Sequence, residues 1–136
     1  MEKEFVPYQE SLELKELGFD ESCFGRYILE GGGAKSMFVL EKCLKQDIGL
    51  CLAPLYQQTF RWFREKFGLL SWVVNMGNLN PEGYTWYTQS IKGIVLNEYC
   101  DPKFKNWCMS FKSYEEAELE CLKELIKIVK NEQHKN

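Results

Sequence analysis

Two stretches of this chain share one residue pattern, and this repetition restricts the folds open to the sequence. The matching positions are Tyr8, Gln9, Ser11 and Leu12 in the first stretch and Tyr56, Gln57, Thr59 and Phe60 in the second. Each stretch ends at a glycine, Gly18 or Gly68, as helices commonly do. Strand-like residues follow each glycine, so the pattern predicts two tandem units, each a helix followed by a hairpin.

The predicted helices cover residues 7–17 and 54–67, and the predicted hairpins pair 23–29 with 35–40 and 69–75 with 84–92. On this interpretation the internal repeat comprises residues 5–40 and 53–92. Coincidence between two short amphipathic helices is the alternative, because helical patterning alone produces many apparent matches.

The last part of the chain predicts a third helix over residues 113–131. Ser113 and Glu116 have the spacing of a capping box, in which the side chain of each residue accepts a hydrogen bond from the main-chain N–H of the other. Apolar residues recur on one side at helical spacing: Tyr114, Ala117, Cys121, Leu125 and Ile128, widened by Leu122 and Val129. Residues 94–99 and 107–111 are candidate extra strands, and a short turn of helix is expected at 41–45 within an otherwise ambiguous stretch, 41–53.

The length of 136 residues suits a single domain, and 45% hydrophobic residues with a net charge of only −3 favour a folded chain. We therefore expect one α+β domain over residues 1–136, with three helices packed on antiparallel sheet. Extra strands and the C-terminal helix would follow the two repeated units.

The charge balance and the N-terminus limit the partners and the compartment. Acidic residues outnumber basic ones by 20 to 17, so we do not expect nucleic acid as a partner. The N-terminus lacks the apolar stretch of a signal peptide, and no apolar run is long enough to span a membrane. These features predict a cytoplasmic protein without membrane contact.

A cytoplasmic location implies that the six cysteines are thiols. They are Cys23, Cys43, Cys51, Cys100, Cys108 and Cys121. None forms a Cys-x-x-Cys pair, so buried thiols are favoured over a zinc cage built from distant cysteines. We expect no metal and no cofactor.

Catalytic residues are hard to find in this sequence. The only histidine, His134, lies in a C-terminal tail expected to fray, where it could not serve a nucleophile. Glu30, Glu82 and Glu98 lie near predicted strand ends and would be needed for a carboxylate-dependent hydrolase, although solvated carboxylates are the commoner case. No catalytic residue is assigned, and a non-enzymatic protein is favoured.

Surplus apolar and aromatic residues provide the interaction hypothesis. Both repeated helices carry a second apolar stripe, and strand residues 84–88 carry aromatics on both faces. The resulting interface candidates are Leu14, Leu55, Trp62, Trp72, Tyr84 and Trp86. Plain core is the alternative for these residues, because aromatics fill cores as well as interfaces. Arg61 and Arg64 are candidates for binding the phosphate of a nucleotide whose base stacks on a nearby aromatic ring.

Several blocks of the sequence resemble an uncharacterised family of small phage and mobile-element proteins of gut anaerobic bacteria. The blocks are FVPY (5–8), LKELGFD (14–20) with CF (23–24), APLYQQ (53–58), FRWFREKFGL (60–69) and YEEAELECL (114–122). The resemblance implies a small accessory protein made inside a bacterial cell, and it brings no activity, cofactor or site residue. The match is poorest over residues 75–112.

The favoured function is a non-enzymatic binding module that contacts a protein partner or itself, most simply as a homodimer. The alternatives are a small-ligand binder that sequesters a host nucleotide signal and a carboxylate-dependent hydrolase.

Overall fold

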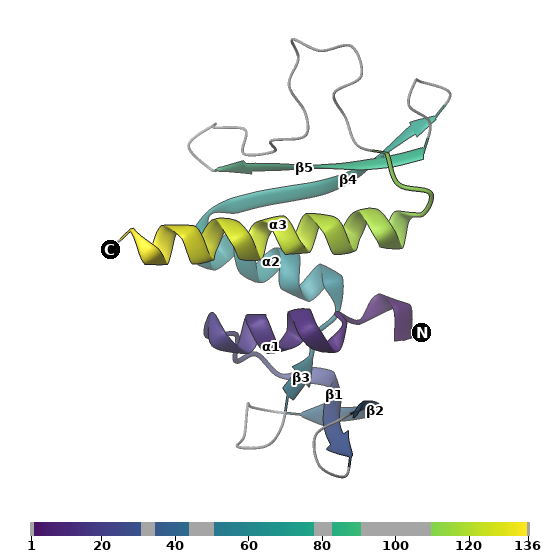
Figure 1. Cartoon of the computed structure of the whole chain (residues 1–136), viewed down its shortest axis with the longest axis vertical. Helices are drawn as coiled ribbons and strands as arrows, with labels where there is room; N and C mark the ends of the chain where they lie inside the picture. Colours follow the sequence, from purple (N-terminus) through teal and green to yellow (C-terminus); the bar gives the residue numbers. More distant parts are fainter. Residues whose placement is uncertain (1, 31–34, 44–50, 78–82, 91–109, 136) are drawn as a thin grey trace. The chain divides into compact units, whose positions relative to one another are not determined.

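The computed structural model describes residues 2–30, 35–43, 51–77, 83–90 and 110–135. In chain order the elements are 3-10 helix η1 (Glu2–Glu4), α1 (Tyr8–Glu16), β1 (Cys23–Glu30), β2 (Lys35–Cys43), β3 (Cys51–Ala53), α2 (Tyr56–Phe67), β4 (Leu69–Gly77), β5 (Gly83–Ser90) and α3 (Tyr114–His134). Figure 1 shows these helices and strands along the chain. Helices and antiparallel sheets are both present, so the α+β class predicted from the sequence is confirmed.

The chain groups into two compact units, Met1–Thr59 and Phe60–Asn136, and the boundary falls inside α2. A helix followed by a hairpin occurs in the order α1, β1, β2 and again in the order α2, β4, β5. The single domain over residues 1–136 and the internal repeat both stay predictions.

The first unit is organised by a three-stranded antiparallel sheet in the order β2–β1–β3. Its centre is Tyr27 on β1, which is paired with Phe38 on β2 and with Cys51 on β3. The Phe38 ring lies 5.7 Å from the Tyr27 ring and 4.9 Å from the Phe5 ring. Tyr8 of α1 packs against the same cluster, so one face of the sheet is covered by the helix that precedes it.

Glycine ends both predicted helices, as expected from the sequence. Gly18 has a φ of 96° and Gly68 a φ of 67°, values that residues with a side chain rarely adopt. After Gly18 the chain turns back, and the Phe19 N–H donates a 2.9 Å hydrogen bond to the Leu14 carbonyl oxygen. Phe19 is buried there, which agrees with a residue folded back on the last turn of α1.

The short turn of helix expected at 41–45 is wrong for residues 41–43, which continue strand β2. Cys43 pairs with Cys23 across the sheet, and the Glu41 carboxylate forms a 2.7 Å ion pair with Arg26 on β1. These cross-strand partners are distant in sequence, so local helix propensity could not reveal them. Residues 44–50 lie outside the described part of the chain.

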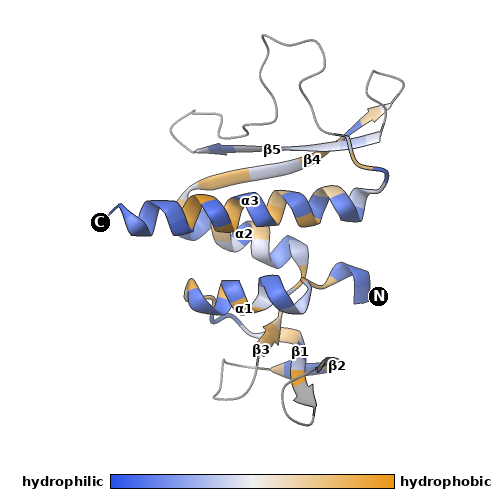
Figure 2. Cartoon of the chain, viewed as in Figure 1, coloured by the Kyte–Doolittle hydropathy of each residue, from blue (hydrophilic) through white to orange (hydrophobic). Residues whose placement is uncertain are grey.

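The second unit is built on the β4–β5 hairpin, with α3 packed along one face of it (Figure 1). The register pairs Val73 with Trp86 and Trp72 with Tyr87. Trp86 is buried in a cluster with Ala117 and Cys121 of α3. Figure 2 shows apolar and charged residues alternating along α3, the pattern of a helix with one face on a core.

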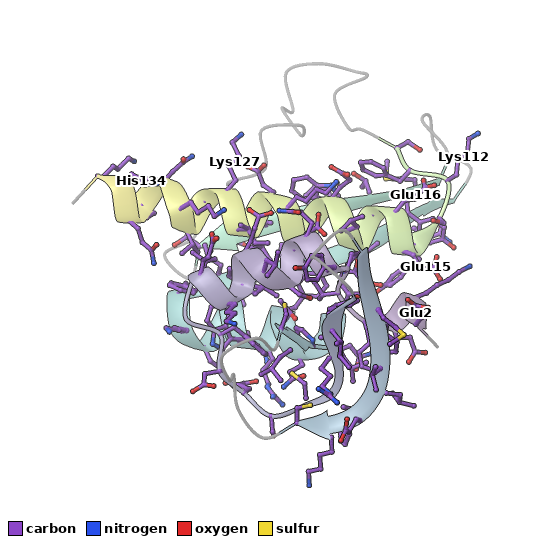
Figure 3. All side chains as sticks on the ribbon, turned by 60° about the horizontal axis from the view of Figure 1, so that its bottom comes forward. Glu2, Lys112, Glu115, Glu116, Lys127 and His134 are labelled. Atoms are coloured by element: carbon purple, nitrogen blue, oxygen red, sulfur yellow. The ribbon has the colours of Figure 1, made fainter. Side chains whose placement is uncertain are left out.

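The start of α3 is capped as predicted, with one difference. The Ser113 Oγ accepts a 3.2 Å hydrogen bond from the Glu116 N–H, while the Glu116 carboxylate accepts from the Lys112 N–H at 3.3 Å rather than from Ser113. Figure 3 labels Lys112 and Glu116 at this end and His134 at the other. Helix α3 runs to His134, three residues beyond the end predicted at residue 131.

The predicted extra strands lie mostly outside the described residues. Residues 94–99 and most of 107–111 fall in this category, whereas Phe111 is described and pairs with Tyr84 of β5. Two main-chain hydrogen bonds of 2.9 and 2.8 Å join these residues. The strand-like character predicted for residue 111 is thus confirmed at that one position.

Candidate interaction surface

The face of the β4–β5 hairpin opposite α3 is the candidate site. Successive side chains of a strand point to opposite faces, so residues paired with one another share a face. Val73 and Trp86 face α3, which places their neighbours on the other side. We call this side the Trp72 face, and its members by pairing are Leu70 with Gln89, Trp72 with Tyr87, and Val74 with Thr85.

An aromatic pair occupies the middle of the Trp72 face. The rings of Trp72 and Tyr87 lie 5.6 Å apart with their planes 24° from parallel, which is a stacked arrangement. Such a pair contributes about 0.5–1.5 kcal/mol beyond its buried area, so the two rings hold one another in place. The result is a stacked aromatic pair in the middle of the Trp72 face.

Exposure on this face is concentrated at Trp72. Its side chain is 44% exposed, while Leu70, Val74 and Tyr87 are half-buried and Thr85 is only 2% exposed. Phe24 at 60% and Tyr114 at 46% are more exposed, so Trp72 is distinguished by its stacked partner and its uncharged neighbours rather than by its exposure. The open part of the face is therefore the Trp72–Tyr87 pair and its apolar neighbours.

The Trp72 face carries no charged side chain. All six members are apolar, aromatic, hydroxyl or amide residues, in a chain of which 27% is Asp, Glu, Lys or Arg. Depletion of charge is the compositional mark of the central part of protein–protein interfaces. The same absence gives the face no electrostatic attraction for phosphate groups or nucleic acid.

The structure divides the six predicted interface residues. Leu14, Trp62 and Trp86 are buried, Leu55 and Tyr84 are partly buried, and Trp72 is exposed. Tyr84 and Trp86 belong to the hydrophobic cluster under α3, on the opposite face of the hairpin from Trp72. The register pairs Trp72 with Tyr87, so these three interface candidates do not lie on one face of the hairpin.

Leu14 and Leu55 also have core surroundings. Leu14 is fully buried, and Leu55 packs against the cluster that contains Phe5 and Tyr27. The second apolar stripe of the repeated helices thus contributes buried and partly buried side chains.

Trp62 is enclosed by aromatic neighbours of its own helix. Its ring lies 5.1 Å from the Phe63 ring and 5.2 Å from the Phe67 ring, and the Lys66 ammonium lies 5.1 Å from its centre. A buried ring so surrounded cannot stack on a base. Arg61 and Arg64 are exposed on α2, and their role in binding a nucleotide phosphate stays a prediction.

Tyr87 is the site residue that sequence reasoning missed. The signal was present, because Tyr84 and Trp86 alternate with Thr85 and Tyr87 along the strand. What the alternation alone could not tell is which of the two faces α3 covers.

The described residues offer little else for chemistry. Among them, no group of three or more His, Cys, Asp or Glu side chains is arranged to hold a metal ion. Burial raises the pKa of the Cys121 thiol to about 12, which keeps it protonated and unreactive on the buried face of α3. His134 is exposed at the last position of α3, and Glu82 and Glu98 lie outside the described residues.

In the part of the chain that the structure describes, none of the helices combines the length and apolarity needed to cross a membrane.

Comparison with known proteins adds no relative: no family model, no curated protein and no solved structure matches the chain. The resemblance to small phage and mobile-element proteins stays a prediction.

Proposed function

We propose that this chain is a non-enzymatic accessory binding module that acts by self-association through the Trp72 face. The observation that carries the proposal is the exposed Trp72 ring, stacked on Tyr87 in the middle of an uncharged sheet face. Trp and Tyr are among the residue types most enriched at the positions that dominate binding energy in protein interfaces.

A second copy of the chain is the simplest partner for such a face. A twofold axis near Trp72 would place one Trp72–Tyr87 pair on its counterpart, and a symmetric dimer needs only one self-complementary patch. Flat, stacked rings without charge meet this requirement because they bring no like charges together. A different protein with an uncharged aromatic patch is the other form of the same proposal.

The cellular setting of the proposal comes from the sequence. The residue blocks that resemble those of phage and mobile-element proteins support a small accessory protein made in the bacterial cytoplasm. A reducing cytoplasm also accords with cysteines kept as thiols.

Light scattering coupled to size-exclusion chromatography over a range of concentrations tests self-association. We expect the wild-type chain to form dimers as concentration rises and Trp72→Ser to remain monomeric. Phe24→Ser is the matched control, because Phe24 is 60% exposed but lies on β1, next to the charged Arg26. It should dimerise like the wild type.

A wild-type chain that stays monomeric at every concentration would overturn self-association. Equal loss of dimer in Trp72→Ser and Phe24→Ser would mean that the chains associate through nonspecific hydrophobic contacts, and it would reject the Trp72 face as the interface. Circular dichroism of each variant establishes that the fold is retained.

A further inference from the structure

Two cysteines of the first unit lie directly opposite one another across a pair of strands. Cys23 begins β1, Cys43 ends β2, and the register makes these two residues partners. The strand register shifts by one residue between this pair and the next, in which Gly25 is the partner of Leu40. Directly opposed residues of antiparallel strands have Cα atoms about 4.5–5.5 Å apart. This separation lies inside the range that a disulfide bond bridges, about 4.4–6.8 Å.

The third cysteine of this sheet is placed differently. Cys51 on β3 pairs with Tyr27, four residues along β1 from Cys23. Four residues of strand correspond to about 13 Å, well beyond disulfide reach. Cys43 and Cys51 are separated further, because β1 lies between their strands. The register thus singles out one pair among the three thiols.

We infer that Cys23 and Cys43 form a reversible oxidation site, which a low-molecular-weight disulfide of the oxidised glutathione class converts into an intramolecular disulfide bond. Both cysteines are free thiols in the structure, so this pair is shown in its reduced form. The site is independent of the Trp72 face, because both cysteines belong to the first unit.

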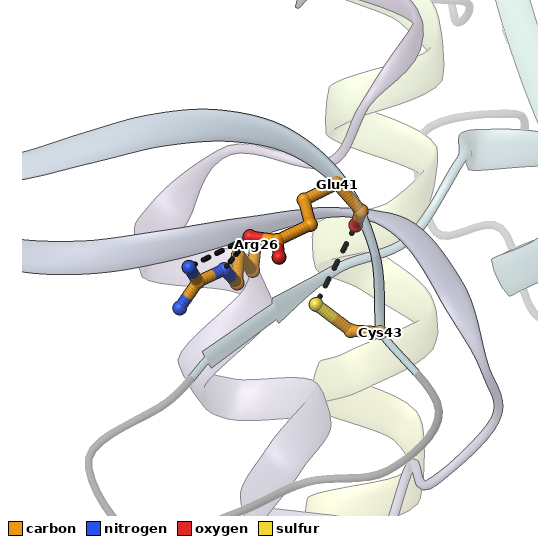
Figure 4. A network of polar contacts seen from close by, with 3 residues as sticks. All are labelled: Arg26, Glu41 and Cys43. Atoms are coloured by element: carbon orange, nitrogen blue, oxygen red, sulfur yellow. Dashed lines mark hydrogen bonds and ion pairs between the residues drawn. The ribbon is translucent and has the colours of Figure 1, made fainter.

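The two thiols differ in access, which sets the order of events. Cys23 is 1% exposed, whereas Cys43 is partly exposed at the end of its strand. In Figure 4 the Cys43 Sγ reaches the Glu41 carbonyl oxygen, at 3.5 Å, and the Glu41 carboxylate holds Arg26. The hydrogen bond from the Cys43 Sγ to the Glu41 carbonyl oxygen is long and therefore weak, so it opposes rotation of the Cys43 side chain little. The positive charge of Arg26 lowers the pKa of the Cys43 thiol and so favours its thiolate.

The reaction proceeds by two exchanges that balance. The Cys43 thiolate attacks one sulfur of the small disulfide, forming a mixed disulfide at Cys43 and releasing one small thiolate. The Cys23 thiol then loses its proton, and its sulfur attacks the Cys43 Sγ and displaces the second small thiolate. The two protons of the protein thiols end on the two released small thiols, so the protein is oxidised and the small disulfide is reduced.

Electrostatics agrees with the proximity. Burial is the main cause that raises the pKa of Cys23 to about 12, and Cys43 is the next, ahead of Cys51. Burial also raises the pKa of Cys43, against the lowering effect of Arg26. Both thiols are thus poor nucleophiles at neutral pH, and the exchange is expected to be slow, as suits a response to sustained oxidation.

The test uses the full chain incubated with mixtures of reduced and oxidised glutathione, then alkylated and weighed by mass spectrometry. We expect loss of two hydrogen atoms and of two alkylation sites, reversed by dithiothreitol. Trypsin cuts after Lys and Arg, so Cys23, Cys43 and Cys51 fall on three different peptides, 16–26, 43–45 and 46–61. The expected product joins peptide 16–26 to peptide 43–45.

Three serine variants define the roles. Cys23→Ser should stop at one glutathione attached to Cys43, Cys43→Ser should lose the reaction, and Cys51→Ser should form the same linkage as the wild type. A wild-type chain that stays unmodified, that stops at the mixed disulfide, or that links any other pair, including Cys100 or Cys108, overturns the inference. Circular dichroism shows whether each variant keeps its fold, and the wild-type peptide map decides the matter without any variant.

Discussion

The hydroxyl group of Tyr27 donates a 2.7 Å hydrogen bond to the main-chain carbonyl oxygen of Val6. The same oxygen accepts a second hydrogen bond, of 3.1 Å, from the Ser11 Oγ of α1. Val6 also donates its N–H to the Pro54 carbonyl oxygen at 2.8 Å. A fully buried residue therefore links the centre of the sheet, the first helix and the segment that follows β3.

Because the Val6 carbonyl oxygen accepts two hydrogen bonds, we expect mutations of its two donors to have non-additive effects on stability. Tyr27→Phe or Ser11→Ala alone should each cost about 1 kcal/mol, because the other donor still satisfies the oxygen. The double variant should lose more than the sum of the two, since a buried carbonyl is then left without a partner. Urea unfolding of the four proteins measures this coupling, and simple additivity would contradict it.

Gly25 on β1 predicts a steric cost for any side chain. A Cβ at this position would lie 2.6 Å from the Phe38 Cε2 and 3.1 Å from the Phe5 Cε1. Gly25→Ala should therefore destabilise the first unit by about 1–3 kcal/mol. Phe38→Leu in the same chain makes room and should restore part of this loss, as thermal unfolding will show. If the Gly25→Ala/Phe38→Leu double variant is no more stable than the sum of the two single effects predicts, the loss of stability does not come from a clash with Phe38.

The cap of α3 predicts a local effect in the second unit. Ser113→Ala removes the acceptor for the Glu116 N–H and should lower stability by about 1 kcal/mol, while Ser113→Asp should retain most of it. Hydrogen exchange of the amides in the first turn of α3 provides the measurement. Equal protection in Ser113→Ala and wild type would mean that the cap contributes nothing.

Buried thiols predict a loss of stability at alkaline pH. Burial raises the pKa from 9.0 to about 12 for Cys23 and to about 11 for Cys51. Above pH 9 the unfolded chain releases these protons while the folded chain keeps them, so the free energy of unfolding falls as the pH rises. The stabilising effect is complete below the unfolded pKa of 9.0 and disappears as pH rises through the window up to about 11–12.

Urea unfolding under reducing conditions at about pH 8 and about pH 10 tests this slope. Cys51→Ala should flatten it by up to about 1.4 kcal/mol per pH unit within the window. Cys43→Ala is the control with the smaller expected change, because Cys43 is partly exposed. Stability that stays level between these two conditions would contradict the buried thiol argument.

Local signals in the sequence predicted most of the elements. Gly18 and Gly68 end the helices where expected, and Ser113 marks the start of α3. These signals depend on residues within one turn of each other, so a single sequence contains them in full. Strand-like runs predict the presence of both hairpins in the same way, although β2 continues to Cys43 and β4 to Gly77, beyond their predicted ends.

Long-range pairing was the part that the sequence could not supply. The pairing of Cys23 with Cys43 and of Trp72 with Tyr87 depends on register, and a shift by one residue would send each side chain to the other face. For the same reason the sequence does not distinguish Trp86, which α3 covers, from Trp72, which lies on the opposite face. The sequence therefore predicted that the candidate site would be aromatic and would include Trp72, but it did not predict that Tyr87 would be the partner of Trp72 on that face.

Helix α2 runs without interruption across the boundary between the two compact units. Any attempt to dissect the chain at that boundary would leave one fragment with carbonyl groups that have lost their donors and the other with N–H groups that have lost their acceptors. A helical turn cut from its nucleus is also costly to re-form. Residues 1–59 and 60–136 are each compact, yet neither can be excised at that boundary as a finished piece.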